Sequence, residues 1–320
     1  MKHSNDDHSA TNVAGVPLWQ QITPIWHKFE YLRLIAMHPN FTLDYFPVEY
    51  YSRSATEHSR LSLFSRIMPK KNSPVTLQES VSFAPLVHQT KSRMRHQRDE
   101  AHLIPSQFLR RDSLHGKIEL HASQWSIQVA SKPIGSLRMV YIHGPKNQII
   151  NTWVFPNRPS HMPVFAAELI AVGAEVRVAF VDVQAPVIES SSILDDTSML
   201  TSGIAPRFAG LPCDEDPPYW AIESSQGNYT YARNVPAECL YQVEECYTTY
   251  LDAYLKGFVN KSVGTGLATM ERDEIALDKL QEYQHHHMQS SPGNKFLSKL
   301  FGPDWTESFM RDYLFAKPRG

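Results

Sequence analysis

Residues 162–172 read MPVFAAELIAV and residues 176–183 read VRVAFVDV, with only Gly173–Glu175 between them. Both runs are apolar, and Pro163 stands near the start of the first, so each run predicts a β-strand. A link this short joins neighbouring strands as an antiparallel hairpin, because a parallel connection needs about a dozen residues. These two strands therefore predict an antiparallel sheet.

The same pattern of short apolar runs and short links continues on the N-terminal side of this hairpin. Further strands are predicted at 117–120, 124–130, 137–143 and 148–155. No helix-length segment separates the strands, which disfavours a parallel sheet. After the sheet, the helical spacing of apolar residues predicts helices at 238–259, about 267–288, 295–301 and 305–315. Residues 187–235 are predicted to be rich in loops because of their prolines.

The N-terminal part of the chain is less informative. Residues 1–15 are polar and predict a disordered tail, whereas residues 17–37 have helical spacing that Pro24 interrupts. No repeat or linker divides the remainder. We therefore expect 16–320 to form one domain, an antiparallel sheet whose two faces are covered by helices from both ends of the chain.

Composition excludes several classes of protein. Hydrophobic residues make up 42% of the 320 residues and charged residues 20%, with a net charge of −2. These values are typical of a globular protein and argue against nucleic-acid binding. No apolar run reaches the roughly 18 residues of a membrane span, and the N-terminus resembles neither a secretion signal nor a transit peptide. Three cysteines without C-x-x-C spacing suit a reducing compartment and cannot hold an iron–sulfur cluster. We expect a cytoplasmic monomer.

Glu168 is the most unusual residue of the strand at 162–172. Side chains alternate between the faces of a strand, so Glu168 shares an otherwise apolar face with Ala166 and Ile170. Loss of water there favours the neutral carboxyl group, so we expect a raised pKa and the ability to deliver a proton near neutral pH. The two alanines before Glu168 leave room for a flat ligand. The alternatives are a solvated edge strand or a pairing with a buried arginine.

The familiar cofactor and metal motifs are absent from the sequence. Gly264-Thr265-Gly266 lacks the third glycine of a dinucleotide fingerprint. His285, His286 and His287 would point about 100° apart on a helix and so cannot face one metal ion. We therefore expect no metal and no bound cofactor. A redox enzyme of this kind would take its electrons from a partner protein.

Three segments in the second half of the chain follow a known order of motifs. They are NTWVFP at 151–156 with MPVFAAEL at 162–169, VAFVDVQAP at 178–186, and a C-terminal series of Ser291-Pro292, Phe296-Leu297, Phe301-Gly302, Trp305-Thr306-Glu307 and Tyr313-Leu314-Phe315. In this order they resemble the ferredoxin-dependent bilin reductases, which reduce biliverdin and related open-chain tetrapyrroles in phytobilin synthesis. The resemblance covers roughly 120–318.

The resemblance implies a fold and a mechanism. The fold class is α/β, a three-layer α/β/α sandwich with a central antiparallel sheet flanked by helices. The family uses no metal or flavin: ferredoxin delivers one electron at a time, the bilin carries the radical, and protein carboxylates supply protons. Glu168 is the implied proton donor, and Asn151 is a second catalytic residue. The residues expected to bind substrate are Phe165, Ala166, Asp182, His286 and Ser291.

Two residues depart from the family's pattern. The acid on the central strand is usually Asp, whereas Glu168 holds its carboxyl group one methylene, about 1.5 Å, further from the backbone. Red chlorophyll catabolite reductases resemble the chain in having Glu there. Most bilin reductases have Asp where Ser291 stands, and a hydroxyl is a poor acid. Asn151 matches the Asn of members that form 15,16-dihydrobiliverdin, so we expect reduction at the 15,16 methine bridge or a phycoerythrobilin-type product.

Structural roles for these residues remain alternatives. Asn151 could bond to a neighbouring strand, Asp182 could cap the end of its strand, and Ser291 could cap a helix that begins at Pro292. Ser291 in place of an acid also suits a bilin carrier with impaired catalysis. Glu168 suits a reductase of a chlorophyll-derived linear tetrapyrrole.

A basic cluster precedes the strands. Its members are Lys91, Arg93, Arg95, Arg98, Arg110 and Arg111. Ferredoxins are acidic and biliverdin carries two propionates, so the cluster is a candidate for docking ferredoxin or for binding substrate. A solvated helix face is the alternative. Lys295, Lys299 and Arg311 are further candidates for either role.

Overall fold

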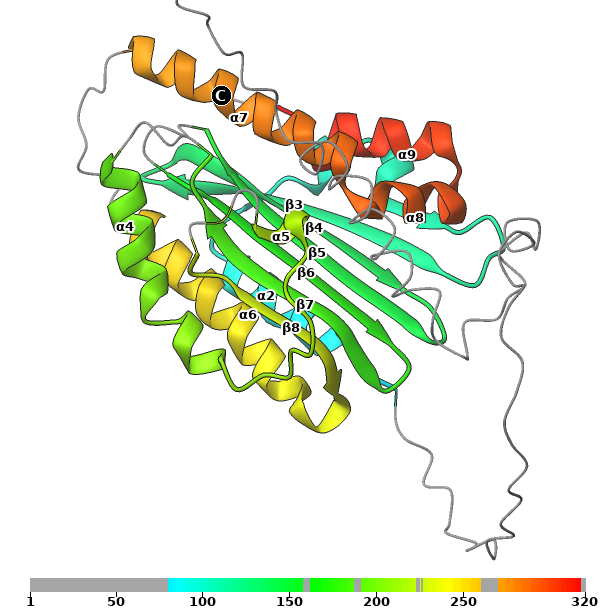
Figure 1. The fold of residues 1–320 in the computed structure, drawn as a ribbon. Helices are drawn as coiled ribbons and strands as arrows, with labels where there is room; N and C mark the ends of the chain where they lie inside the picture. Colours follow the sequence, from blue (N-terminus) through cyan, green and yellow to red (C-terminus); the bar gives the residue numbers. More distant parts are fainter. Residues whose placement is uncertain are drawn as a thin grey trace, which may run out of the picture. The chain divides into compact units, whose positions relative to one another are not determined.

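Eight strands of the described residues form one antiparallel sheet (Figure 1). They are β1 (Arg98–Asp99), β2 (Arg110–Asp112), β3 (Glu119–Val129), β4 (Lys132–His143), β5 (Asn147–Pro156), β6 (Val164–Val172), β7 (Glu175–Gln184) and β8 (Thr230–Pro236). Their order is β1-β3-β4-β5-β6-β7-β8, with β2 also paired to β3. The computed structural model describes residues 80–157, 162–186, 191–222, 225, 227–259 and 270–317. The tail predicted at 1–15 and the helix predicted at 17–37 lie outside these residues.

The strands from β3 to β7 follow one another along the chain, and each pairs with the next, as the short links predict. The two strands predicted at 117–120 and 124–130 are one strand, β3. Only two residues separate β3 from β4, fewer than the gap between the strands predicted at 124–130 and 137–143. Ala130 and Ser131 form this turn with positive φ angles of 49° and 65°, a backbone that matches the twist of paired strands. Pro133 is accommodated in β4 because its pairing with β3 is irregular at that point.

Helices cover both faces of the sheet (Figure 1). One layer contains α2 (Ala84–Met94), α4 (Ser191–Ser202) and α6 (Leu240–Tyr254), which continues as a π-helix over Leu255–Val259. The other contains α7 (Met270–Ser290), α8 (Pro292–Phe301) and α9 (Pro303–Phe309), which continues as a π-helix over Met310–Leu314. The connections hold the short helices α3 (Ser106–Leu109) and α5 (Tyr219–Ile222) and 3₁₀ turns at Ala101–Leu103, Ala205–Phe208 and Ala237–Cys239. The predicted three-layer α/β/α sandwich is confirmed.

The segment 187–235, predicted to be rich in loops, also contains regular elements that the prediction missed. The segment contains α4 and the edge strand β8, which pairs with β7. Asn234 and Pro236 are unfavourable in a strand, so β8 depends in part on the ladder with β7. The four helices predicted after the sheet are present, with boundaries shifted by a few residues. In the part of the chain that the structure describes, no helix has the length and apolar character needed to cross a membrane.

The apolar core lies between the sheet and the layer of α2 and α6. Phe165 of β6 is fully buried there, with its ring centroid 6.0 Å from that of Tyr247 and 5.9 Å from that of Tyr254. The Tyr247 hydroxyl lies 3.1 Å from the hydroxyls of both Thr90 on α2 and Thr152 on β5. These bonds satisfy a buried polar group and tie both helices to the sheet.

Replacing Phe165 by alanine is expected to lower the free energy of unfolding by about 3–5 kcal/mol, because it removes a buried ring and leaves a cavity between two fixed tyrosines. Urea unfolding followed by circular dichroism measures this loss. A Phe165→Leu control should lose less, since it fills most of the space. A loss below about 1 kcal/mol for the alanine variant would show that Phe165 does not pack in this core.

Candidate functional site

Glu168 lies on the opposite face of the sheet, the one covered by α7. Its direct cross-strand partners are Asn151 on β5 and Phe180 on β7. Directly opposed residues of antiparallel strands have Cβ atoms about 4.5–5.5 Å apart. Glu168 and Asn151 are also both partly accessible to solvent. The structure therefore brings the two predicted catalytic residues side by side.

A second row of residues crosses the same face one step along the strands. Ala166 lies between Trp153 on β5 and Asp182 on β7, which are its direct cross-strand partners. Asp182 is thus a diagonal neighbour of Glu168, a relation that separates Cα atoms by about 7–8 Å. The small side chain of Ala166 leaves space above the sheet between these larger residues.

Phe165 and Ala167 do not belong to this face. Strand alternation turns both of them to the apolar core, where Phe165 packs against two tyrosines of α6. The expectation that Phe165 contacts substrate is therefore corrected. Of the two alanines expected to make room for a flat ligand, only Ala166 lies beside Glu168.

Helix α7 presents Tyr283 and His287 to the site. Tyr283 is buried, and its hydroxyl donates a hydrogen bond to the side chain of Gln184 on β7. The centroid of the His287 ring lies 4.4 Å from that of Tyr283 and 5.3 Å from that of Trp153. Phe315 stacks on the same histidine. These contacts hold α7 over strands β5 and β7.

The histidine of α7 that faces the sheet is His287 and not the expected His286. His286 is exposed, because successive residues of a helix are turned by about 100°. Ala276, Leu280 and Tyr283 are buried apolar positions that precede it on α7, and His287 continues their helical spacing. That periodicity is the sequence signal that identifies His287.

Polar atoms without partners surround the position of Glu168. Those on this side of the sheet include Asn151 Oδ1, Trp153 Nε1, Asp182 Oδ2 and His287 Nε2, all buried and without a hydrogen-bond partner. The great majority of buried polar atoms in proteins are paired. Because Trp153 offers a donor and Asn151 an acceptor, the group suits a ligand that carries both kinds of polar atom.

The electrostatics of the site favour a neutral carboxyl group and a neutral imidazole. Burial raises the pKa of Asp182 to about 7, although hydrogen bonds with the side chains of Ser225 and Gln184 and from the backbone N–H of Val183 oppose the rise. Burial, together with a smaller contribution from the neighbouring His286, lowers the pKa of His287 to about 3. Near neutral pH a large share of Asp182 is therefore protonated, while His287 is uncharged. The site can donate a proton and can form hydrogen bonds to a ligand.

Ser291 is the N-cap of α8, which is the structural role that the sequence left open for this residue. Its Oγ accepts a hydrogen bond from the backbone N–H of Gly293 at 3.2 Å, and Pro292 follows in the first turn. Its hydrogen bonds in the structure join residues of α7 and α8. A contact between Ser291 and substrate stays a prediction.

A Ser291→Ala variant is expected to lower the free energy of unfolding by about 1 kcal/mol, because the N–H of Gly293 loses its cap. Ser291→Asp should retain the stability of the wild type, since a carboxylate also caps a helix. Thermal unfolding of the three proteins measures both effects. Equal loss in the aspartate variant would contradict the capping role.

The basic cluster is divided among three elements, α2, β1 and β2. Lys91 and Arg95 are exposed at the C-terminal end of α2, on the layer opposite to α7, and Arg93 forms a 2.8 Å ion pair with α6. Arg110 lies on β2 at the edge of the sheet, where it pairs with Glu119. The residues of α2 therefore lie on the wrong side of the sheet to bind a substrate beside Glu168. Docking of ferredoxin by this cluster stays a prediction.

A cavity of about 570 Å³ lies between α7 and the C-terminal residues. Its lining includes Asp278, Glu282, Arg311 and Lys317, so charges of both signs face it. Among the described residues that line it, none is one of the expected catalytic residues. Phe315, which stacks on His287, also lines this cavity.

Comparison with known proteins relates the chain to one family. Residues 87–316 match a family model described as ferredoxin-dependent bilin reductase. A 15,16-dihydrobiliverdin:ferredoxin oxidoreductase of Prochlorococcus marinus (strain NATL1A) is 22% identical over 224 residues, which cover 67% of this chain and 87% of the relative. A phycoerythrobilin:ferredoxin oxidoreductase of Synechococcus sp. (strain WH8020) is 22% identical over 260 residues, covering 77% and 97%. The crystal structure of tomato phytochromobilin synthase in complex with biliverdin shares the fold, with a TM-score of 0.62, 16% identity, and coverage of 73% of this chain and 83% of that one.

Proposed function

The chain belongs to the ferredoxin-dependent bilin reductases, a family of oxidoreductases, and on this basis we propose that it reduces biliverdin or a closely related open-chain tetrapyrrole with electrons from reduced ferredoxin. The observation that carries the proposal is the pair Glu168 and Asn151, set among buried polar atoms that lack partners. A bilin is flat and conjugated and carries pyrrole N–H groups and ring carbonyls. It therefore offers the donors, acceptors and apolar surface that this site can pair with.

Glu168 supplies the first proton in this proposal. Ferredoxin delivers one electron at a time, so the bound bilin becomes a radical, and proton transfer from a nearby carboxyl group neutralises the charge that it gains. Glu168 is partly accessible, which allows the resulting carboxylate to regain a proton from solvent. No bound metal or flavin takes part in the proposed sequence.

Asp182 supplies the second proton. Reduction of one double bond consumes two electrons and two protons, and Ser291 is a poor acid. Asp182 lies diagonally across from Glu168 on the same face, and burial holds its pKa at about 7, so it can carry a proton at neutral pH. Diagonal neighbours lie about 7–8 Å apart, a separation that one tetrapyrrole spans.

Asn151, Trp153 and His287 position the substrate. The Oδ1 atom of Asn151 accepts a hydrogen bond from a pyrrole N–H, and its amide group donates to a ring carbonyl without titrating. Trp153 Nε1 donates to a second carbonyl. These roles are consistent with the structure, because Asn151 Oδ1 and Trp153 Nε1 are buried and have no hydrogen-bond partner within the protein. His287 stays neutral and so offers a hydrogen bond without a positive charge.

The proposed product is 15,16-dihydrobiliverdin, formed by one two-electron reduction at the 15,16 methine bridge. Asn151, in place of a titrating residue, supports this choice. Relatives named 15,16-dihydrobiliverdin:ferredoxin oxidoreductase and phycoerythrobilin:ferredoxin oxidoreductase support the substrate class. A phycoerythrobilin-type product would require a second two-electron reduction.

The test is an anaerobic assay that contains the purified protein, biliverdin, ferredoxin, a ferredoxin reductase and NADPH. The expected result is loss of the biliverdin spectrum and one new bilin that co-elutes with authentic 15,16-dihydrobiliverdin. An unchanged spectrum despite bilin binding would indicate a carrier. A parallel reaction with red chlorophyll catabolite separates the proposed function from a catabolic reductase, because turnover of that substrate alone would contradict it.

A further inference from the structure

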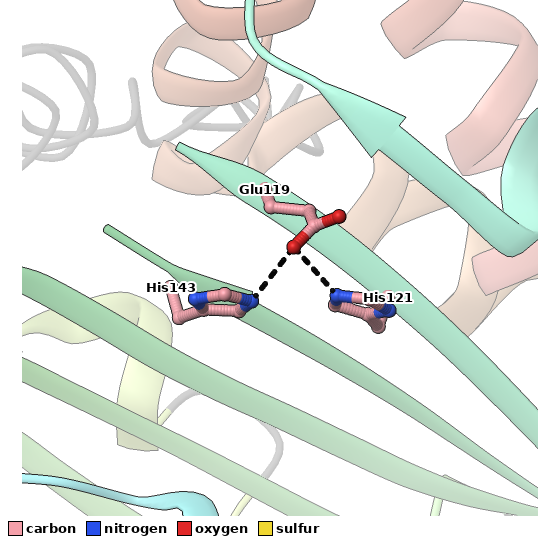
Figure 2. A group of neighbouring side chains, drawn as sticks. All are labelled: Glu119, His121 and His143. Carbon is pink, nitrogen blue, oxygen red and sulfur yellow. Dashed lines mark ion pairs between the residues drawn. The ribbon is translucent and has the colours of Figure 1, made fainter. Parts of the chain in front are cut away.

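Glu119, His121 and His143 form a compact group near one end of strands β3 and β4 (Figure 2). Glu119 pairs directly with His143, and His121 follows two residues along β3 on the same face. Strand pairing carries this row through Gln148 to Ala171, which lies in the core between the sheet and α6. The group therefore lies on the face of the sheet opposite to Glu168 and is separate from the proposed bilin site.

The three side chains converge on one point. The Nε2 atoms of His121 and His143 lie 3.1 Å and 3.2 Å from the same atom, Oε2 of Glu119. Figure 2 shows the two rings reaching this oxygen from neighbouring strands. In a tetrahedral zinc site with bonds of about 2.0–2.1 Å, adjacent ligand atoms lie about 3.3 Å apart. The nitrogen–oxygen distances already match that separation.

The two imidazole rings are stacked beside one carboxylate oxygen, with centroids 5.3 Å apart and planes 9° apart. Neutral imidazoles and a carboxylate are the form that binds a divalent ion.

The surroundings hold this arrangement in place. Tyr141 stacks on His143, and its hydroxyl donates to Gln148 at 2.8 Å. Arg110 pairs with Oε1 of Glu119, which leaves Oε2 directed at the histidines. Contacts of this kind, between a ligand and its neighbours, orient metal ligands in proteins. The positive charge of Arg110 also lowers the affinity of the site for a cation.

We propose that Glu119, His121 and His143 bind one divalent transition-metal ion, Zn²⁺ in preference to Mg²⁺ or Ca²⁺. Two imidazoles and one carboxylate are the ligands of a borderline ion, whereas Mg²⁺ and Ca²⁺ take oxygen ligands. His121 and His143 are 39% and 38% exposed, so solvent can complete the coordination. The ion would join β3 to β4 and stabilise the folded state by binding to it alone. The three consecutive histidines at 285–287 are not among these ligands.

The experiment uses the full chain without a histidine tag, treated with a chelator and dialysed. Isothermal titration calorimetry with ZnCl₂ should show one site that MgCl₂ does not fill, and the midpoint of thermal unfolding should rise with Zn²⁺. His121→Ala and His143→Ala should each weaken binding by at least roughly tenfold. His102→Ala is the matched control, an exposed histidine outside the group, and should bind as the wild type does.

Two results would contradict the proposed metal site. One is a wild-type protein that binds no Zn²⁺. The other is a His121→Ala/His143→Ala double variant, with a wild-type circular dichroism spectrum, that binds Zn²⁺ with unchanged affinity, because the ion would then sit on other histidines. Glu119→Gln provides an independent check, since it removes the charged ligand while keeping both rings, and it too should weaken binding.

Discussion

Replacing Glu168 by glutamine is expected to lower bilin turnover by a factor of about 10² to 10⁴, which is the usual contribution of a positioned general acid. Bilin binding should be retained, because the amide keeps the shape and the hydrogen-bonding ability of the side chain. Electron transfer from ferredoxin does not need this proton, so the one-electron-reduced bilin should accumulate. Stopped-flow absorption and binding titrations with biliverdin measure the two effects separately.

The control for this variant is Glu168→Asp. It keeps a carboxyl group at this position, one methylene closer to the backbone. We expect it to keep more activity than the glutamine variant, because the carboxyl group is retained and only its reach changes. Full turnover by Glu168→Gln would remove Glu168 from the mechanism, as would equal loss in both variants.

Replacing Asp182 by asparagine is expected to lower turnover by about 10²-fold, because the second proton loses its donor. The wild-type rate should decline as the pH rises past about 7, where Asp182 gives up its proton. The asparagine variant should lack that decline. The pH dependence of single-turnover rates tests this, and an identical decline in both proteins would assign the pH dependence to another group.

The same substitution should change how stability depends on pH. Burial raises the pKa of Asp182 from 3.8 to about 7, so between these values the folded protein binds a proton that the unfolded chain releases. Stability of the wild type therefore falls as the pH rises from about 4 to about 7, by about 1.4 kcal/mol per unit of pKa shift. Relative to the wild type, Asp182→Asn should be more stable at pH 8 than at pH 5. Urea unfolding at both values measures this, and a pH-independent difference would contradict the assigned pKa.

Much of the fold follows from the sequence because its signals are local. Apolar runs with short links predict the antiparallel strands from β3 to β7, and their alternation puts Glu168 on the face opposite to Phe165. Placing Phe165 at the substrate disregards that alternation, and the structure corrects it. Strand β8 escapes prediction because it depends in part on the ladder that β7 offers and not only on its own composition.

The site follows from the sequence only in part, because it depends on how the layers meet. The resemblance indicates Glu168 and Asn151, and the register of β5 and β6 brings them together. The choice between His286 and His287 depends on how α7 is turned toward the sheet, which apolar periodicity could have settled. The raised pKa of Asp182 comes from the residues that bury it, and these are distant in the sequence.

Electron paramagnetic resonance of anaerobic mixtures of protein, biliverdin and reduced ferredoxin, with the products identified by chromatography, tests most directly whether Glu168 protonates a bilin radical. With the wild type, we predict a transient organic radical that decays as 15,16-dihydrobiliverdin forms. With Glu168→Gln, we predict that the radical persists and that product is scarce. A wild type that binds biliverdin but forms neither radical nor product would contradict this mechanism. So would a Glu168→Gln variant that forms product at the wild-type rate.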